Sequence, residues 1–188
     1  MSLKCNALMV FLVVVCNLGY AQTAKVVDKK GTLVTIEQGI GNLAEIFNGF
    51  SAAQTISDSF SEIVFSNSGI VDTSDFSVDR TSITIKKSGR YEITYRVSTD
   101  ANNNERSGGE FYLQIWGAEI AGTRAYTYAR NSLVDKNTVS VTKIMEITIT
   151  GTTGVVVKVK GRVYASTAAV SSLTMVNEGS SLIVKRIK

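Results

Sequence analysis

A regular alternation of apolar and polar residues over residues 81–98 is the feature that most constrains the fold. Ile83 and Ile85 alternate with polar residues ahead of a turn at residues 86–89. After the turn, the apolar positions of the alternation are Tyr91, Ile93, Tyr95 and Val97. Because successive side chains of a strand point to opposite faces, this stretch predicts a β-hairpin with one buried and one solvated surface.

The chain beyond residue 60 repeats this pattern. Polar segments typical of turns occupy residues 100–109, 131–137 and 151–154, and β-branched and aromatic residues alternate with polar ones between them. No helical stretch separates the strands, which argues against a parallel βαβ fold. We predict an all-β, antiparallel β-sandwich of about eight or nine strands. Lys143 interrupts an otherwise apolar face and predicts a β-bulge or an exposed strand end.

The N-terminus has the features of a secretory signal peptide over residues 1–21. Lys4 precedes a mostly apolar run at residues 7–15, and small residues stand at Gly19 and Ala21. The run is too short to span a bilayer, so we expect cleavage after Ala21, a secreted or cell-surface location and no integral membrane segment in the mature chain. An alternative is that Cys16 serves as a lipid-attachment site.

Residues 22–60 are expected to form an N-terminal packing or assembly segment ahead of a main domain at residues 61–188. A short strand is predicted at residues 32–36. Beyond it, the apolar spacing of Leu43, Ile46, Phe47 and Phe50 favours one or two helical turns. The segment either packs against the main domain or lends a strand or helix to a neighbouring subunit.

The missing residue types restrict the chemistry. The chain has no histidine, and both of its cysteines, Cys5 and Cys16, lie in the predicted signal peptide. The commonest general base, thiolate catalysis and cysteine-based zinc sites are therefore excluded from the mature chain. No Gly-x-Ser-x-Gly or phosphate-binding glycine motif is present. We expect no enzyme activity, and the formal net charge of +4 is too small and too dispersed to indicate nucleic-acid binding.

The order of the segments resembles the globular head of complement subcomponent q and the wider tumour-necrosis-factor-like jelly-roll superfamily. The resemblance covers about residues 60–187. It is carried by the strand, turn and Gly-x-Tyr pattern at residues 83–93, the strand and short turn at 111–117, the long β pair across 151–154 and the terminal strand at 181–184. It implies a jelly-roll β-sandwich that forms a compact homotrimer and presents its loops to a ligand.

Clustered carboxylates give a first set of candidate site residues. Asp72, Asp75 and Asp79 lie close together in the sequence, and a second polar loop carries residues 102–105. Oxygen ligands of this kind suit calcium, and some relatives of the resembled superfamily bind calcium on exposed loops. The spacing matches no calcium loop, and Asp is common in turns for their geometry alone. We therefore expect no cofactor, with calcium at these three aspartates as the open alternative.

An arginine and tyrosine stretch gives the second set. On a strand, Arg124, Tyr126, Tyr128 and Arg130 share one face, and Trp116 joins them if its own strand is a neighbour. Tyrosine and arginine are favoured at binding hot spots and attract each other through cation–π contacts. In a trimer this face would be a subunit interface, and in a monomer a site for a glycan or a protein partner. The plain alternative is a tyrosine ladder that covers the outside of a sheet.

These observations predict a secreted, non-enzymatic binding or adhesion protein that self-associates as a homotrimer, with an extracellular protein or glycan as its ligand. The alternative is a structural subunit of an extracellular filament or coat, assembled through residues 22–60.

Overall fold

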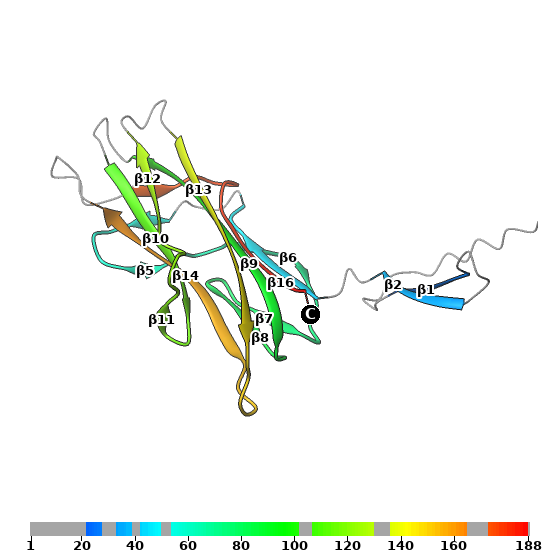
Figure 1. Ribbon diagram of the computed structural model, residues 1–188. Helices are drawn as coiled ribbons and strands as arrows, with labels where there is room; N and C mark the ends of the chain where they lie inside the picture. Colours follow the sequence, from blue (N-terminus) through cyan, green and yellow to red (C-terminus); the bar gives the residue numbers. More distant parts are fainter. Residues whose placement is uncertain are drawn as a thin grey trace, which may run out of the picture. The chain divides into compact units, whose positions relative to one another are not determined.

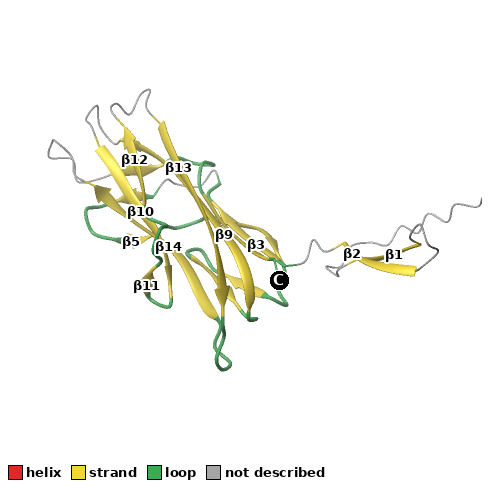
Figure 2. Ribbon diagram, in the orientation of Figure 1, coloured by secondary structure: helices red, strands yellow, loops and turns green. Residues whose placement is uncertain are grey.

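The computed structural model describes residues 22–27, 33–38, 42–49, 54–101, 107–129, 136–164 and 173–187. The predicted signal peptide, Cys16 and Phe50 lie outside these residues. Two compact units divide the chain, Met1–Gln38 and Gly39–Lys188. All regular structure in the described residues is β-strand, as Figure 2 shows. In that same part of the chain, no helix is long and apolar enough to cross a membrane.

The first unit contains one antiparallel hairpin, formed by β1 (Gln22–Val27) and β2 (Leu33–Gln38). The predicted strand at residues 32–36 is confirmed as β2. Apolar residues pair across the hairpin, with Ala24 opposite Ile36 and Val26 opposite Val34.

The second unit is a sandwich of two antiparallel sheets (Figure 1). One, the β10 sheet, runs in the order β12 (Ala125–Ala129), β10 (Ser107–Ile115), β14 (Val155–Tyr164), β8 (Ser82–Ile85) and β7 (Phe76–Val78), with β11 (Ala118–Glu119) beside β10 and β5 (Ser61–Glu62) beside β14. The other, the β9 sheet, runs in the order β13 (Lys136–Ile147), β9 (Gly89–Ala101), β16 (Ser181–Arg186), β3 (Leu43–Phe47) and β6 (Asn67–Val71). In the β9 sheet, β15 (Leu173–Met175) also pairs with β9, and β4 (Thr55–Ile56) pairs with β15.

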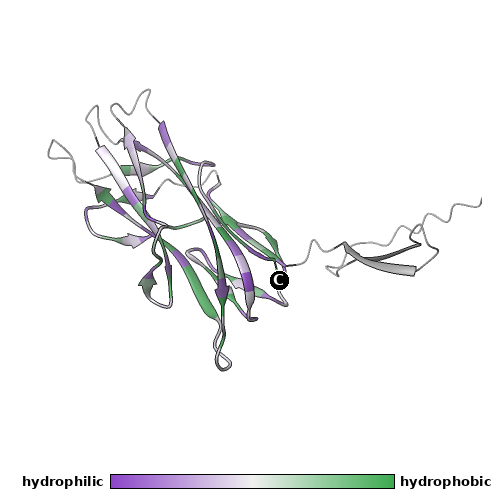
Figure 3. Ribbon diagram, viewed as in Figure 1, coloured by the Kyte–Doolittle hydropathy of each residue, from purple (hydrophilic) through white to green (hydrophobic). Residues whose placement is uncertain are grey.

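The hydrophobic core lies between the two sheets, and β9 is its largest contributor. Tyr91, Ile93, Tyr95 and Val97 are fully buried, so the predicted core face is confirmed. From the opposite sheet, β10 supplies Phe111, Leu113 and Ile115, and β14 supplies Val155, Val157, Val159 and Val163. Figure 3 shows hydrophobic and hydrophilic residues following one another along the strands, as expected when each strand buries one face.

The predicted hairpin at residues 81–98 is wrong in its pairing. β8 pairs with β7 and β14 in the β10 sheet, whereas β9 pairs with β13, β15 and β16 in the β9 sheet. Residues 86–88 therefore carry the chain from one sheet to the other. The same correction applies to the long β pair expected across residues 151–154, because β13 and β14 also lie in different sheets. The apolar–polar pattern of a strand predicts which face it buries but not which strand it pairs with. In a jelly roll, consecutive strands often belong to different sheets, so strands adjacent in sequence need not form a hairpin.

The helical turns predicted from Leu43 onwards are also wrong. These residues form β3, which is paired on both edges, with β16 and with β6. β3 buries Ala44 and Ile46, and it belongs to the compact unit that begins at Gly39 rather than to a segment ahead of the main domain. Pairing on two edges outweighs a helical spacing of only four residues.

Lys143 does not mark a bulge. The register between β13 and β9 is continuous from Lys136 to Ile147, with Lys143 opposite Ile93. β13 is an edge strand in the described part of the sheet, and the Lys143 ammonium reaches out to donate to the Ala121 carbonyl at 3.1 Å. At an edge position, a lysine can pack its aliphatic stem along the apolar face while its ammonium reaches a polar partner beyond that face.

The Tyr95 hydroxyl joins the two sheets inside the core. Tyr95 belongs to β9, and its hydroxyl donates to the carbonyl of Thr123 at 2.7 Å and approaches that of Phe111 at 3.2 Å. Burial raises the pKa of this phenol, so the hydroxyl keeps its proton at all ordinary pH values. A buried hydroxyl with a partner on the facing sheet fixes how the two layers sit on each other.

A buried carboxylate makes a second connection at one end of the sandwich. Asp75, immediately before β7, forms ion pairs with Lys87 and with Arg186 of β16, the latter at 3.2 Å. Burial alone would raise the pKa of Asp75, but hydrogen bonds from Lys87, Ser74 and Arg186 outweigh it and the pKa lies below its usual value. Asp75 is therefore charged in the folded protein and has a structural role.

Tyr95→Phe should lower the free energy of unfolding by about 1–2 kcal/mol, because the buried Thr123 carbonyl loses its donor. Urea denaturation followed by tyrosine or tryptophan fluorescence measures the change. Tyr128→Phe, which alters a half-exposed ring on the outside of the β10 sheet, is the matched control. An unchanged free energy of unfolding in Tyr95→Phe would contradict a stabilising role for the hydrogen bond from Tyr95 to Thr123.

Asp75→Asn should lower the free energy of unfolding at neutral pH by about 2 kcal/mol, because two cations lose a charged acceptor. The folded pKa of Asp75 is depressed, so its stabilisation is fully present above the unfolded pKa of about 4 and is lost as pH falls through the folded pKa. Melting temperatures of the two proteins should therefore converge in acid. Asp58→Asn, at an exposed position, is the control, and a gap that persists at the lowest pH would refute this account.

A candidate binding surface of tyrosine and arginine on the β10 sheet

The solvent face of the β10 sheet brings together residues from three adjacent strands. In the register, Glu110 of β10 lies opposite Tyr126 of β12 on one side and Arg162 of β14 on the other. One step along, Gly108 lies between Tyr128 and Tyr164 in the same way. We call this set the Tyr–Arg surface, and its members are Phe60, Glu110, Tyr112, Arg124, Tyr126, Tyr128, Arg162 and Tyr164.

A buried carboxylate holds two arginines at the centre of the Tyr–Arg surface. The Glu110 side chain is only 2% exposed, and its two oxygens are shared between Arg124 and Arg162. The Arg162 Nε lies 2.7 Å from Glu110 Oε2, and the Arg124 guanidinium contacts Oε1. A second carboxylate, Glu119, is bound by the other side of Arg124, with Nε donating at 2.9 Å. Each guanidinium is therefore fixed in orientation by charge-assisted hydrogen bonds.

Aromatic rings lie against the two arginines. The Arg162 guanidinium carbon is 4.4 Å from the centroid of the Phe60 ring, and that of Arg124 is 5.4 Å from the Tyr112 ring. Phe60 and Tyr112 meet edge to face with centroids 4.9 Å apart. These separations fall within the range of cation–π and aromatic pair attraction, which adds to the ion pairs in holding the cluster rigid.

Three tyrosines give the Tyr–Arg surface its exposed apolar area. Tyr126, Tyr128 and Tyr164 are 52%, 47% and 49% exposed. Tyr126 and Tyr164 contact each other with centroids 5.0 Å apart at an interplanar angle of 61°. Gly108 permits the close approach of β10 and β12 beneath these rings, because a Cβ there would lie 2.8 Å from the Thr127 carbonyl oxygen. The rings rest on regular strands, so little conformational entropy remains to be lost on binding.

Glu119, Arg124 and Tyr112 keep their protonation states around neutral pH. The hydrogen bond from Arg124 lowers the pKa of Glu119, and the bond to Glu119 in turn raises the pKa of Arg124. Burial raises the pKa of the Tyr112 phenol. Glu119 therefore stays ionised, Arg124 stays protonated and the Tyr112 phenol stays neutral. None of these three groups is poised for proton transfer near pH 7.

Sequence reasoning found part of this surface. The structure brings the predicted Arg124, Tyr126 and Tyr128 together, with Tyr126 and Tyr128 on β12 and Arg124 immediately before it. β12 pairs with β10, the strand that precedes Trp116. Trp116 is 57% exposed but lies in the tight turn between β10 and β11, where it and Gly117 adopt positive φ angles of 54° and 75°. In the register, it lies six residues beyond Glu110 along the chain, far from Tyr126. Arg130 lies outside the described residues.

Five contributors were missed, namely Phe60, Glu110, Tyr112, Arg162 and Tyr164. Three of them come from β14 and from the segment before β5, far from residues 124–130 in the sequence. The outward position of Arg162 and Tyr164 could have been predicted from the sequence, because β14 alternates valines with Lys158, Lys160, Arg162 and Tyr164. What the sequence does not contain is the pairing of β14 with β10, which places these residues beside Glu110.

Two of the aspartates predicted as calcium ligands, Asp72 and Asp79, accept hydrogen bonds within turns and loops of the fold. Asp72 accepts bonds from the Asn42 amide at 2.9 Å and from Ser74, and Asp79 accepts bonds from the amides of Thr81 and Ser82 at 2.6 and 2.7 Å. Burial alone would raise the pKa of both carboxyls, but these bonds hold the pKa values below the usual range. Among the described residues, no group of three or more acidic, histidine or cysteine side chains is arranged to hold a metal ion.

Comparison with known proteins places the fold. No protein family and no curated protein matches the chain by sequence. Among solved structures, murine APRIL at pH 8.5 is similar, with 11% identity and a TM-score of 0.50 over 77% of this chain and 98% of that chain. Eiger TNF from S. frugiperda has 10% identity and a TM-score of 0.50 over 78% and 92%.

The globular domain of zebrafish complement 1qA has 13% identity and a TM-score of 0.47 over 78% of this chain and 98% of that one. At these identities the similarity concerns the fold alone. The two structures with a TM-score of 0.50, those of APRIL and Eiger TNF, confirm the antiparallel jelly-roll β-sandwich and, at the level of fold, the predicted resemblance to tumour-necrosis-factor-like proteins.

Proposed function

We propose that the protein is a secreted or cell-surface binding protein without enzyme activity, which self-associates as a homotrimer and engages an extracellular protein through the Tyr–Arg surface. The observation that carries the binding role is the set of half-exposed rings Tyr126, Tyr128 and Tyr164 beside two oriented arginines. Tyrosine and arginine dominate the binding energy of many protein interfaces when a rigid scaffold presents them. The trimer rests on the fold similarity.

The proposed partner is a protein with acidic or amide groups opposite the arginines. Arg162 uses its Nε for Glu110, whereas Arg124 is bound by Glu110 on one side and by Glu119 on the other. Both arginine side chains remain more than one-third exposed, Arg124 at 35% and Arg162 at 38%. Lys158 and Lys160 of β14 extend the positive side of this region, with Lys158 2.6 Å from Glu62. Pairing with a partner carboxylate at this rim mainly raises the association rate, and the rings supply affinity. No cofactor takes part.

Tyr126→Ala combined with Tyr128→Ala should weaken partner binding at least tenfold, because two hot-spot rings are removed from an interface. Residues 22–188 are assayed on an array of purified extracellular domains, and affinity for any bound partner is then measured by surface plasmon resonance. Ile144→Ala, which removes an exposed apolar side chain from the other sheet, is the control. Light scattering on the same samples tests for a mass three times that of the chain.

The outcomes separate the two parts of the proposal. A monomeric mass removes the trimer but leaves the binding role. Partner binding that survives the double substitution removes the Tyr–Arg surface as the site. If the double substitution instead dissociates the trimer, the surface is a subunit interface and the partner must bind elsewhere.

A second candidate function is that of a structural subunit of a filament or coat. The observation in its favour is that β1 and β2 form a compact unit of their own and pair with each other in a two-stranded sheet. An isolated two-stranded hairpin is at best marginally stable in water. Addition to a sheet edge of another subunit is a common way to complete such an element.

Deletion of the hairpin tests the filament function. If the hairpin links subunits, residues 22–188 form polymers or heterogeneous oligomers, and residues 39–188 do not. The truncation begins at Gly39 because a start near Ser57 would remove β3 from the interior of the β9 sheet. Size-exclusion chromatography with light scattering measures both. Identical, discrete masses for the two proteins exclude the hairpin as the link.

A further inference from the structure

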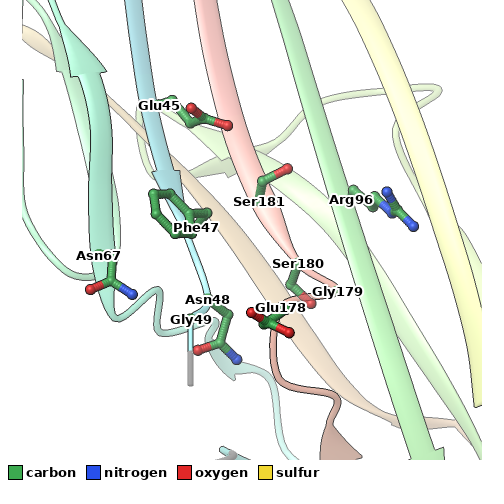
Figure 4. Close-up of a pocket in the computed structure, with 10 residues that line it drawn as sticks. All are labelled: Glu45, Phe47, Asn48, Gly49, Asn67, Arg96, Glu178, Gly179, Ser180 and Ser181. Atoms are coloured by element: carbon green, nitrogen blue, oxygen red, sulfur yellow. The ribbon is translucent and has the colours of Figure 1, made fainter. Parts of the chain in front are cut away.

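A second site lies on the solvent face of the β9 sheet, which faces away from the Tyr–Arg surface across the sandwich. A pocket of about 740 Å³ opens there, and its size falls within the range of about 300–1,000 Å³ typical of small-molecule sites. Figure 4 shows its lining residues, which come from β3 and the two residues after it, β6, β9, β16 and the turn before β16. Those that define its chemistry are Glu45, Phe47, Asn48, Arg96, Glu178 and Ser181.

The strand register explains the shape of the pocket. Ser181 of β16 lies directly opposite Phe47 of β3 on one side and Arg96 of β9 on the other. In Figure 4 the ring and the guanidinium lie on either side of the small serine. Cross-strand neighbours have Cβ atoms about 5 Å apart, so the ring and the guanidinium stem from positions about 10 Å apart. A serine floor between two long side chains makes a groove as wide as one sugar ring.

Two side-chain donors of the pocket, those of Arg96 and Asn48, have no partner among the described residues. Within the described part of the chain, Arg96 makes no ion pair or hydrogen bond, whereas Arg90, on the same face of β9, pairs with Glu146 at 2.8 Å. Asn48 is 3% exposed, and its Nδ2 has no hydrogen-bond partner among those residues, although its Oδ1 accepts from Ser66 at 3.2 Å. A buried donor without a partner at a pocket is unusual in a stable fold.

The backbone supplies an independent observation. Glu178, in the turn before β16, has a φ of 62°, a conformation that glycine or asparagine normally occupies. The neighbouring Gly179 is in tight contact, since a Cβ there would lie 2.4 Å from that of Ser98. A glutamate held in the left-handed region at the rim of a pocket points to a role for its side chain, because glycine would fit the turn with less strain.

The charge pattern selects the class of ligand. The pocket is lined by one arginine and two glutamates. A simple anion is therefore repelled by the net negative charge, and a simple cation is repelled by Arg96. An amino acid holds its ammonium and carboxylate within a few ångströms of each other, whereas β16 lies between the strands that carry Arg96 and Glu45. A neutral polyol uses all the groups, because its hydroxyls donate to carboxylates and accept from the guanidinium and the amide. Its C–H face suits the Phe47 ring.

We propose that this pocket binds a neutral saccharide unit, with Arg96 and Asn48 as donors to its oxygens, Glu178 and Glu45 as acceptors from its hydroxyls and Phe47 as the stacking ring. This site is independent of the Tyr–Arg surface and does not require the function proposed for that surface.

The test uses residues 22–188 and four neutral methyl glycosides, those of glucose, galactose, mannose and N-acetylglucosamine. Titration into ¹⁵N-labelled protein, followed by NMR, should show saturable shifts of the Gly179, Ser180 and Ser181 amides for at least one glycoside, with a dissociation constant in the millimolar range. Arg96→Gln and Glu178→Gln should each weaken that glycoside about tenfold, because each removes a charge-assisted hydrogen bond. Arg90→Gln, on the same strand and face, should leave affinity unchanged.

Three results would overturn the proposal. The first is the absence of saturable shifts with all four glycosides. The second is equal or tighter binding of methyl glucuronide, in which a carboxylate replaces the hydroxymethyl group of the glucoside, because such binding would define an anion site. The third is equal loss of affinity in Arg90→Gln and Arg96→Gln. Unchanged amide spectra outside the pocket establish that each variant is folded.

Discussion

The period of two residues along each strand is the constraint on which the rest of the structure depends. Each strand of a two-layer sandwich buries alternate side chains and leaves the others for the outside. Tyr91, Ile93, Tyr95 and Val97 therefore fix not only the core but also where Arg96 lies. On β10, burial of Phe111 and Leu113 assigns Glu110 and Tyr112 to the opposite face. The register of both candidate sites is a direct result of how the core is packed.

Glu110 shows how a charge is retained on such a scaffold. A carboxylate with 2% exposure is costly to desolvate, and the cost is offset only when cations and hydrogen bonds surround it. Removing one partner of such an arrangement typically costs about 3–5 kcal/mol, yet replacing the whole set by apolar residues is often neutral or stabilising. Fold stability alone therefore does not account for Glu110. Orientation of Arg124 and Arg162 beside exposed rings does, which is why the Tyr–Arg surface is the candidate site.

The faces of the strands could be predicted from the sequence, and their partners could not. The alternation at residues 81–98 identified the buried residues correctly, but both the hairpin there and the β pair across residues 151–154 span two sheets. Likewise, the face shared by Arg124, Tyr126 and Tyr128 was predictable, whereas Glu110 and Tyr164 reach it through long-range pairing. Leu43–Phe47 was misassigned because its apolar spacing matches a helical turn, and only pairing on both edges makes it a strand.

Several polar side chains on the outer face of the β9 sheet satisfy one another's hydrogen bonds. On the β9 sheet, Thr94 pairs with Thr142 at 2.8 Å, and Ser98 pairs with Thr138 at 2.7 Å, each across neighbouring strands. A face that closes its own hydrogen bonds has little to offer a ligand. Against that background, the Arg96 guanidinium and the Asn48 amide nitrogen, which have no partner among the described residues, stand out at the pocket. A trimer that covered this face would have to satisfy the same two donors, so occupancy of the pocket and subunit contact there exclude each other.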